Sequence, residues 1–277
     1  MKNKFFYLAF IFSYTFAIAQ QRTEVGLENI IEEYKATLES TTRIMDCGHF
    51  LDTPASFVKD MENRSLDAML PFTDVNKDKL GREIYRDVLK ANKVVKNHPA
   101  EKEISNIISK LVNSMQPENK RKFDLIILDT EIINAFTTFG GYIYLTTGLL
   151  NFVDSYDELA FILGHEIGHE IELHTQRKIT KLIVSSNIMS RVSLEEYKDL
   201  AIGINTKISA PFSQIDEYEA DQYGFLLAEK AGYDVNHFDD FFEKIEKYDD
   251  KSILKKMTST HPFAEDRKNC INEYISK

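Results

Sequence analysis

The chain has 277 residues, of which 43% are hydrophobic and 28% charged, so it can bury a complete core, and its few Gly and Pro residues exclude a low-complexity chain. Its formal net charge is -10 at pH 7, with 44 acidic residues against 34 basic ones. The sequence has no long cluster of Lys and Arg, so a nucleic-acid partner is not expected.

The N-terminus differs in composition from the rest of the chain. Two lysines precede an apolar run from Phe5 to Phe16, which ends in Ala17-Ile18-Ala19. This pattern is typical of a secretory signal peptide, residues 1–19, cleaved after Ala19. The run is shorter than the roughly 20 residues that span a bilayer. We therefore expect a periplasmic or secreted protein without a stable transmembrane anchor. The alternative is a membrane-associated protein with an uncleaved N-terminus.

Helical spacing of apolar residues follows the signal peptide. It predicts helices at 24–45, 79–96 and 100–115. We divide the mature chain into an N-terminal helical extension, residues 20–78, and a main domain, residues 79–277.

Two cysteines lie far apart in the sequence, Cys47 in the extension and Cys270 near the C-terminus. In an oxidising compartment they could form a disulfide. Two buried thiols are the alternative, and neither cysteine has a neighbour at the CxxC spacing of a zinc site.

The spacing of apolar residues is no longer helical after the third predicted helix. The apolar run at 122–129 predicts a strand, and a second extended piece is expected at 142–145. A helix should open near Ser155, where a Ser-x-x-Glu sequence can form a capping box. Another helix is expected from Ser213 to Ala231, with Gly232 after its end and two further helices beyond. The prediction is a helix-rich α+β domain with a small sheet.

The predicted helix after Ser155 carries LGHEIGHEIELH. His165 and His169 lie four residues apart, so they share one helix face, and two imidazoles there can bind one Zn²⁺ at about 2.0–2.1 Å. Glu166 lies about 100° round the helix, where it can reach a metal-bound water without binding the metal. Zinc lowers the pKa of that water, and a carboxylate takes its proton as it attacks a carbonyl. The alternative is two histidines satisfied by hydrogen bonds alone.

A third ligand does not follow on the same helix. In the zinc pattern HExxHxxGxxH, a Gly and a His would stand where this chain has Glu172 and Thr175. His174 misses that position, and we expect it at the surface or in support of a ligand.

A carboxylate from the later helix DEYEADQYGFLLAEKAGY is the obvious source. Glu217 and Asp221 share a face with Gly224, flanked by Ala220, and these small residues allow a close approach to the first helix. Glu219 lies on the opposite, solvated face. We predict Glu217 as the third ligand and Asp221 as the residue that orients a histidine through its other ring nitrogen.

Four motifs occur in the order NAF…GGYIYLTTGLL, DELAFILGHE, GHEIGHEIELH and EYEAD. In this respect the chain resembles the HtpX-like and CAAX-prenyl-protease-like gluzincin metallopeptidases, from about Gly81 to Arg267. The resemblance implies a zincin-type α+β fold with a sheet edge strand beside the active-site helix. It implies one Zn²⁺ per chain, held by His165, His169 and Glu217, with Glu166 as general base.

The resemblance also implies a place for a peptide substrate. The strand that begins Gly140-Gly141-Tyr142 would be the sheet edge on which a peptide lies as an added strand, with Asn134 as a further substrate-binding residue. An ordinary edge strand is the alternative. Members with transmembrane helices have apolar spans that this chain lacks. It is most similar to the soluble, exported bacterial branch, so prenyl-protein processing is not expected.

The run STHPFAEDR holds two further candidate catalytic residues. Pro262 favours a helix start, so His261 should cap that helix. The positive helix end should lower the pKa of the imidazole, although Glu265 and Asp266 in the first turns oppose this effect. A neutral His261 could bind zinc at its fourth position or donate to the tetrahedral oxyanion, with Arg267 as a charged helper. A simple cap is the alternative on the residues alone, and a His-Pro segment after the acidic motif in the family favours the site role.

Together these residues predict a zinc-dependent endopeptidase that hydrolyses peptide bonds of exported or misfolded proteins. The main alternative is a zinc-holding chaperone-like or regulatory protein of the same fold with little turnover, and the intact Glu166 argues against it. An exopeptidase needs a pocket for a terminal charge, and the sequence carries no signature of one.

Overall fold

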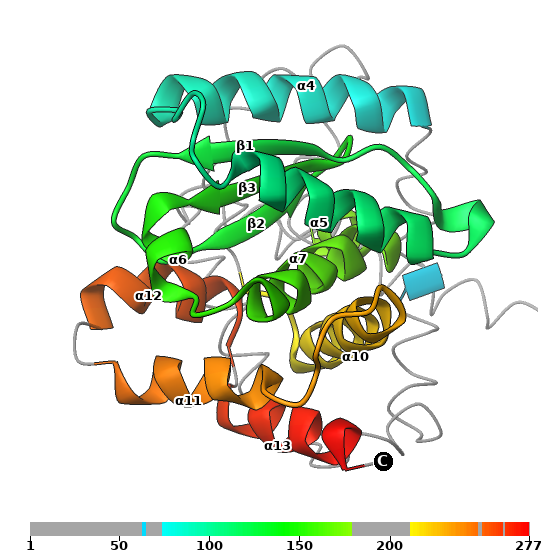
Figure 1. Ribbon diagram of the computed structural model, residues 1–277. Helices are drawn as coiled ribbons and strands as arrows, with labels where there is room; N and C mark the ends of the chain where they lie inside the picture. Colours follow the sequence, from blue (N-terminus) through cyan, green and yellow to red (C-terminus); the bar gives the residue numbers. More distant parts are fainter. Residues whose placement is uncertain (1–62, 65–73, 179–210, 249–250, 263, 277) are drawn as a thin grey trace, which may run out of the picture.

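The computed structural model describes residues 63–64, 74–178, 211–248, 251–262 and 264–276 (Figure 1). The predicted signal peptide, the helix expected at 24–45 and Cys47 lie outside these residues. Cys270 is buried in the last helix and is disulfide-bonded, while its pairing with Cys47 stays a prediction.

Three strands form a small mixed sheet in the order β1-β3-β2. β1 (Asp124–Leu128) runs parallel to β3 (Tyr142–Thr146), and β2 (Ala135–Thr138) runs antiparallel to β3. The predicted strands at 122–129 and 142–145 are confirmed as β1 and β3. β2 was not predicted, because a four-residue strand is too short to show a period of its own.

The sheet lies between two helical layers, and alternate residues of each strand face opposite layers (Figure 1). α4 (Asp74–Ala91) covers one face, and α7 (Tyr156–Ile171) packs against the other with α5 (Glu101–Ser114). The α4 layer contains the following buried residues: Leu80, Ile84, Val88, Ile126, Leu128, Phe139 and Tyr144. The α7 layer includes these sheet residues: Ile127, Ala135, Ile143 and Leu145.

α4 is held closely against the hairpin that joins β2 to β3. A Cβ at Gly81 would lie 2.1 Å from the carbonyl oxygen of Phe139, so only glycine allows this contact. The hairpin turns through Gly140 and Gly141, whose φ angles of +83° and +76° favour glycine. α4 crosses the predicted boundary between residues 78 and 79, and the division into an extension and a domain stays a prediction.

Two capped helices carry the candidate site residues. α7 begins as predicted, since the Ser155 hydroxyl accepts from the backbone N–H of Glu158 at 3.1 Å. α10 (Gln214–Lys230) has a complete capping box between Ser213 and Asp216, and it ends before Gly232, whose φ is +84°.

α7 and α10 approach each other through glycine. A Cβ built on Gly164 would lie 2.9 Å from the Cα of Gly224, and one built on Gly224 would lie 2.6 Å from the backbone nitrogen of His165. The close approach predicted from the small residues of α10 is confirmed. It brings the carboxylates of α10 to the histidines of α7.

The remaining elements surround these two helices (Figure 1). They are η2 (Pro117–Asn119), α6 (Thr147–Phe152), α11 (Phe238–Lys247), α12 (Lys251–Thr260) and α13 (Ala264–Ile275). In the described part of the chain three helices follow α10, where two were expected. None of the helices in the described residues is long and apolar enough to cross a bilayer. The α+β fold prediction is confirmed.

Candidate metal centre

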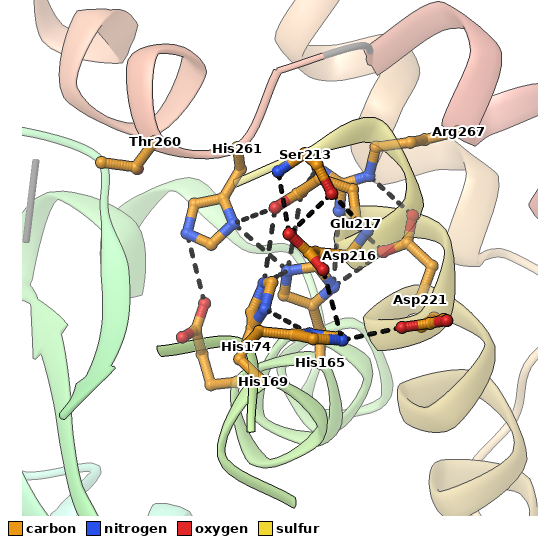
Figure 2. A network of polar contacts seen from close by, with 12 residues as sticks. His165, His169, His174, Ser213, Asp216, Glu217, Asp221, Thr260, His261 and Arg267 are labelled. Carbon is orange, nitrogen blue, oxygen red and sulfur yellow. Dashed lines mark hydrogen bonds and ion pairs between the residues drawn. The ribbon is translucent and has the colours of Figure 1, made fainter. Parts of the chain in front are cut away.

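Four buried side chains converge between α7, α10 and the end of α12 (Figure 2). They are His165 and His169 from α7, Glu217 from α10 and His261 after α12. One nitrogen or oxygen from each lies within 4.8 Å of one from every other member. Their exposed fractions are 8% or less, so these polar atoms have little access to bulk water.

His165 is oriented by a buried ion pair. Its Nδ1 lies 2.8 Å from Oδ1 of Asp221, and the guanidinium of Arg267 donates to both carboxylate oxygens of Asp221 at 2.6 and 2.7 Å. Burial alone would raise the pKa of Asp221, but Arg267 holds it below its usual value. The ionised carboxylate accepts the Nδ1 proton of His165, which leaves a lone pair on Nε2. Asp221 thus lies where it was predicted.

His169 is oriented by a second histidine. Its Nδ1 lies 3.0 Å from Nδ1 of His174, and Nε2 of His174 lies 2.8 Å from Oε2 of Glu219. The carboxylate accepts the Nε2 proton of His174, and we assign the proton between the two Nδ1 atoms to His169. Burial lowers the pKa of His169 well below its usual value. A neutral His169 therefore also has a lone pair on Nε2.

The expectation that Glu219 lies on a purely solvated face is wrong. Its side chain is 24% exposed and bonds to His174. α7 ends at Ile171, and Leu173 adopts a φ of +60°, so the chain turns and brings His174 back towards α10. Helical spacing within α10 does not reveal such a return.

The geometry of the centre fits a metal ion. The Nε2 atoms of His165 and His169 lie 3.0 Å apart, and when both outer nitrogens carry the ring protons, both Nε2 atoms offer a lone pair to the same point. Oxygens of Glu217 lie 3.4 Å from Nε2 of His169 and 3.8 Å from Nε2 of His165. Ligands of a tetrahedral zinc with bonds of about 2.0–2.1 Å are roughly 3.3 Å apart. Two imidazoles and a carboxylate are a common zinc donor set.

Glu217 is fully buried and ionised. Its Oε2 lies 2.6 Å from Nη1 of Arg267, and this cation holds the pKa of Glu217 well below its usual value although burial raises it. Glu166 is also buried, with an exposed fraction of 3%, and it lies outside the convergent group of four. Its Oε1 is 3.6 Å from Nε2 of His261. The carboxylate is therefore beside the centre, as the helical spacing predicted.

His261 does not cap the last helix, and this prediction is wrong. Its backbone N–H donates to the carbonyl of Met257 at 2.7 Å, so it continues the hydrogen bonding of α12, while α13 begins only at Ala264. Its Nδ1 lies 3.1 Å from Glu217 and 3.3 Å from Nε2 of His165. Burial lowers the pKa of His261, but the Glu217 carboxylate outweighs burial and raises it, opposite to the expected direction.

Arg267 has a different surrounding from the one predicted. It is on α13, and its guanidinium contacts the carboxylates of Asp221 and Glu217. These contacts place it behind the ligands as their counterion. A role as a charged helper at the oxyanion has no contact to support it.

The predicted edge strand is wrong in one respect. β3, which begins at Tyr142, is the central strand and pairs with β1 on one side and β2 on the other, so a peptide cannot add to it. Gly140 and Gly141 lie in the hairpin turn, and the Tyr142 ring stacks on Tyr85 of α4 at 4.8 Å. The edge strand that packs on α7 is β2, and Asn134 directly precedes it. Strand order was missed because it depends on long-range pairing.

Two neighbours of the centre were also missed. The Phe212 ring stacks on His169 at 3.8 Å between ring centres, and Nζ of Lys178 lies 3.5 Å from the centre of the Phe212 ring. Both residues flank the segment 179–210, which lies outside the described residues. The one signal that could have suggested a packed residue was an aromatic directly after Pro211.

A helix with HExxH, crossed by a second helix that supplies a buried glutamate, defines a metallopeptidase site. Residues 99–275 match peptidase family M48, and the chain belongs to this family of metallopeptidases. The predicted family and the hydrolase class are thereby confirmed.

The relatives are named proteases. The chain is 34% identical over 149 residues to the mitochondrial metalloendopeptidase OMA1 of Arabidopsis thaliana. This match covers 52% of the chain and 30% of the relative. It is 32% identical over 152 residues to the human metalloendopeptidase OMA1, covering 49% and 29%. It is 27% identical over 162 residues to the beta-barrel assembly-enhancing protease of Yersinia pestis, covering 52% and 33%. The chain spans less than two thirds of the length of the curated relatives it matches.

Proposed function

We propose that the protein is a zinc-dependent endopeptidase with one Zn²⁺ per chain. The observation that carries this proposal is the convergence of His165 Nε2 and His169 Nε2, 3.0 Å apart, with the buried carboxylate of Glu217. These three side chains supply the donor set of a zinc site. Family membership supports the same chemistry.

The roles of the residues follow from their positions. His165, His169 and Glu217 would hold the ion, which when bound would act as a Lewis acid and lower the pKa of a water. Glu166, beside these ligands, would serve as general base towards a water and as general acid towards the leaving amine. Asp221 and His174 keep the two ring nitrogens in the tautomer that can bind a cation.

The substrate in this proposal is an extended polypeptide. β2 is the strand nearest α7 that has a side without a partner among the described strands, and it lies along a groove that reaches His261. The signal-peptide pattern of residues 1–19 supports export to the periplasm or outside the cell. Exported or misfolded proteins are then the substrates at hand, a reading in keeping with the relatives named for β-barrel assembly.

A second candidate is a latent or regulatory form, and one contact favours it. His261 places Nδ1 within 3.3 Å of the His165 nitrogen, among the three ligands, where it competes with the catalytic water. We expect His261→Ala to raise the rate of peptide hydrolysis in the zinc-loaded protein, measured as kcat on a quenched fluorescent peptide. A loss of kcat would instead assign His261 to stabilisation of the oxyanion.

The test of the main proposal separates metal binding from chemistry. Purified protein is analysed for metal and incubated with casein. We expect one zinc per chain and cleavage, and Glu166→Gln should keep the zinc and lose the cleavage, because a base is removed and no ligand is. Glu170→Gln, one turn further along α7, is the matched control. Zinc without cleavage in the wild-type protein would favour the regulatory form, and loss of zinc in Glu166→Gln would make Glu166 a ligand.

A further inference from the structure

A cavity of about 40 Å³ lies beside the metal centre, between α7, α11 and the end of α12. We propose that it binds a small aliphatic side chain of the substrate, of the size of valine, from a residue next to the bond that is cut. This inference rests on the proposed peptidase function and adds a side-chain specificity to it.

The walls of this cavity are mostly apolar. Phe161 and Ile162 line it from α7. Phe241 and Phe242 line it from α11, and Met257 lines it from α12. Each of these side chains is 7% exposed or less. A water molecule in a cavity needs about two to four polar partners, and such walls offer few of them. An apolar group is therefore the occupant that the walls favour.

The cavity is continuous with the metal centre. His165, Glu166 and His261 are also among its lining residues. Glu166 is the residue proposed to act on the water and on the leaving amine, so a side chain that enters here belongs to a residue beside the cleaved bond. Ala135, the first residue of β2, lines the same cavity. A peptide that lies along β2 therefore has the cavity within reach of its side chains.

The charged groups in the lining do not favour an acidic occupant. The guanidinium of Arg267 bonds to the carboxylates of Asp221 and Glu217, and it lies 5.1 Å from the centre of the Phe242 ring. Its charge is thus compensated within the protein. An acidic side chain would lose its hydration in the cavity without a new cation to pair with, and the carboxylate of Glu166 would repel it.

The volume of the cavity limits the size of the occupant. A water or a methyl group needs roughly 10–15 Å³ of such space, so about 40 Å³ has room for about three of them. The branched side chain of valine has this size, whereas alanine would leave most of the space empty and a phenyl ring would exceed it. The walls cannot easily yield, because the Phe242 ring packs against Phe161 at 6.1 Å and against Phe241 at 5.6 Å.

The test uses the zinc-loaded full chain and peptides that differ only in one residue flanking the cleaved bond, with the products identified by mass spectrometry. At one of the two flanking positions we expect kcat/KM for Val to exceed the values for Ala, Thr and Phe by about tenfold or more, since one methylene in an apolar pocket changes kcat/KM by about 10–200-fold. Thr is the sharpest comparison, because it has nearly the shape of Val and differs by a hydroxyl group.

Two variants of the walls should change this preference. Met257→Ala should enlarge the cavity and move the preference from Val to Leu or Phe, whereas a loss of packing alone would lower the rates for all peptides together. Phe241→Leu is a milder change and should move the preference from Val to Leu, so it decides the matter if Met257→Ala does not fold. Leu254→Ala is the matched control, because Leu254 is 1% exposed on the same helix and is not among the lining residues. It should leave the preference for Val unchanged.

Equal kcat/KM for all four residues at both flanking positions would overturn the proposal and assign the cavity to core packing alone. A preference for a charged residue would also overturn it, as would a preference for Val that is unchanged in both wall variants. If no peptide is hydrolysed, the proposed function fails, and binding still decides this inference. In that case fluorescence anisotropy with Glu166→Gln protein should show tighter binding of the Val peptide than of the Thr peptide, and equal affinities would overturn it.

Discussion

His165 and His169 are four residues apart on one helix, yet their outer ring nitrogens are held in different ways. His165 bonds to Asp221, which is fully buried and paired with the buried Arg267. His169 bonds to another imidazole, and the chain of bonds ends at Glu219, whose side chain is 24% exposed. The first support is an ion pair in a medium of low dielectric, and the second reaches solvent. The two proposed ligands therefore differ in how strongly the protein fixes them.

The largest effect is expected from Arg267→Met, which removes the cation of the His165 side. Asp221 and Glu217 would remain as buried carboxylates without their guanidinium partner and with only imidazoles beside them. Breaking a buried pair by removing one partner costs about 3–5 kcal/mol. We expect a loss of that size in the free energy of unfolding, measured by urea denaturation of protein treated with a chelator. Arg121→Met, on a partly exposed arginine, is the control. A loss below about 1 kcal/mol, as for surface pairs, would contradict the buried ion pair.

Asp221→Asn breaks the same support at the next bond. The amide has nearly the shape of the carboxylate, but it can offer its N–H₂ to His165 Nδ1 and so favour the wrong tautomer. We expect zinc affinity to fall by roughly 10–100-fold, as for other residues that orient a ligand. Competition with a fluorescent chelator measures this. An unchanged affinity would mean that packing alone orients His165.

Glu219→Gln tests the His169 side, and here we expect a smaller loss of zinc affinity, below about tenfold, because solvent compensates in part for the lost charge. Glu229→Gln, an exposed residue on the same helix, is the matched control. A loss as large as that of Asp221→Asn would show that the two supports are equivalent and would remove the contrast drawn between them.

The parts of the site that lie within single helices could be predicted from the sequence. The spacing of His165, Glu166 and His169 depends only on helical geometry, and the face shared by Glu217 and Asp221 depends on the same geometry. In the structure His165, His169 and Glu217 converge, and Asp221 contacts His165.

The parts that depend on the turns between elements could not be predicted. His174 reaches His169 only because the chain reverses at Leu173, and His261 enters the centre from the end of α12, not from the start of α13. The central position of β3 likewise follows from pairing with strands before it in the chain. Local periodicity carries no information about such reversals or pairings.

The contact between Gly164 and Gly224 also fixes the register of α10 along α7. A slip of one residue moves a helix by about 1.5 Å and would place Tyr223 or Phe225 where the backbones now touch. The two backbones are too close there for a Cβ, so neither aromatic ring fits. The helices therefore cannot pack with α10 shifted by one residue in either direction. The position of Glu217 along the helix pair, relative to the two imidazoles, is thus fixed to within less than one residue. The backbone contact at Gly224, seven residues beyond Glu217 on α10, therefore sets the position of the Glu217 side chain.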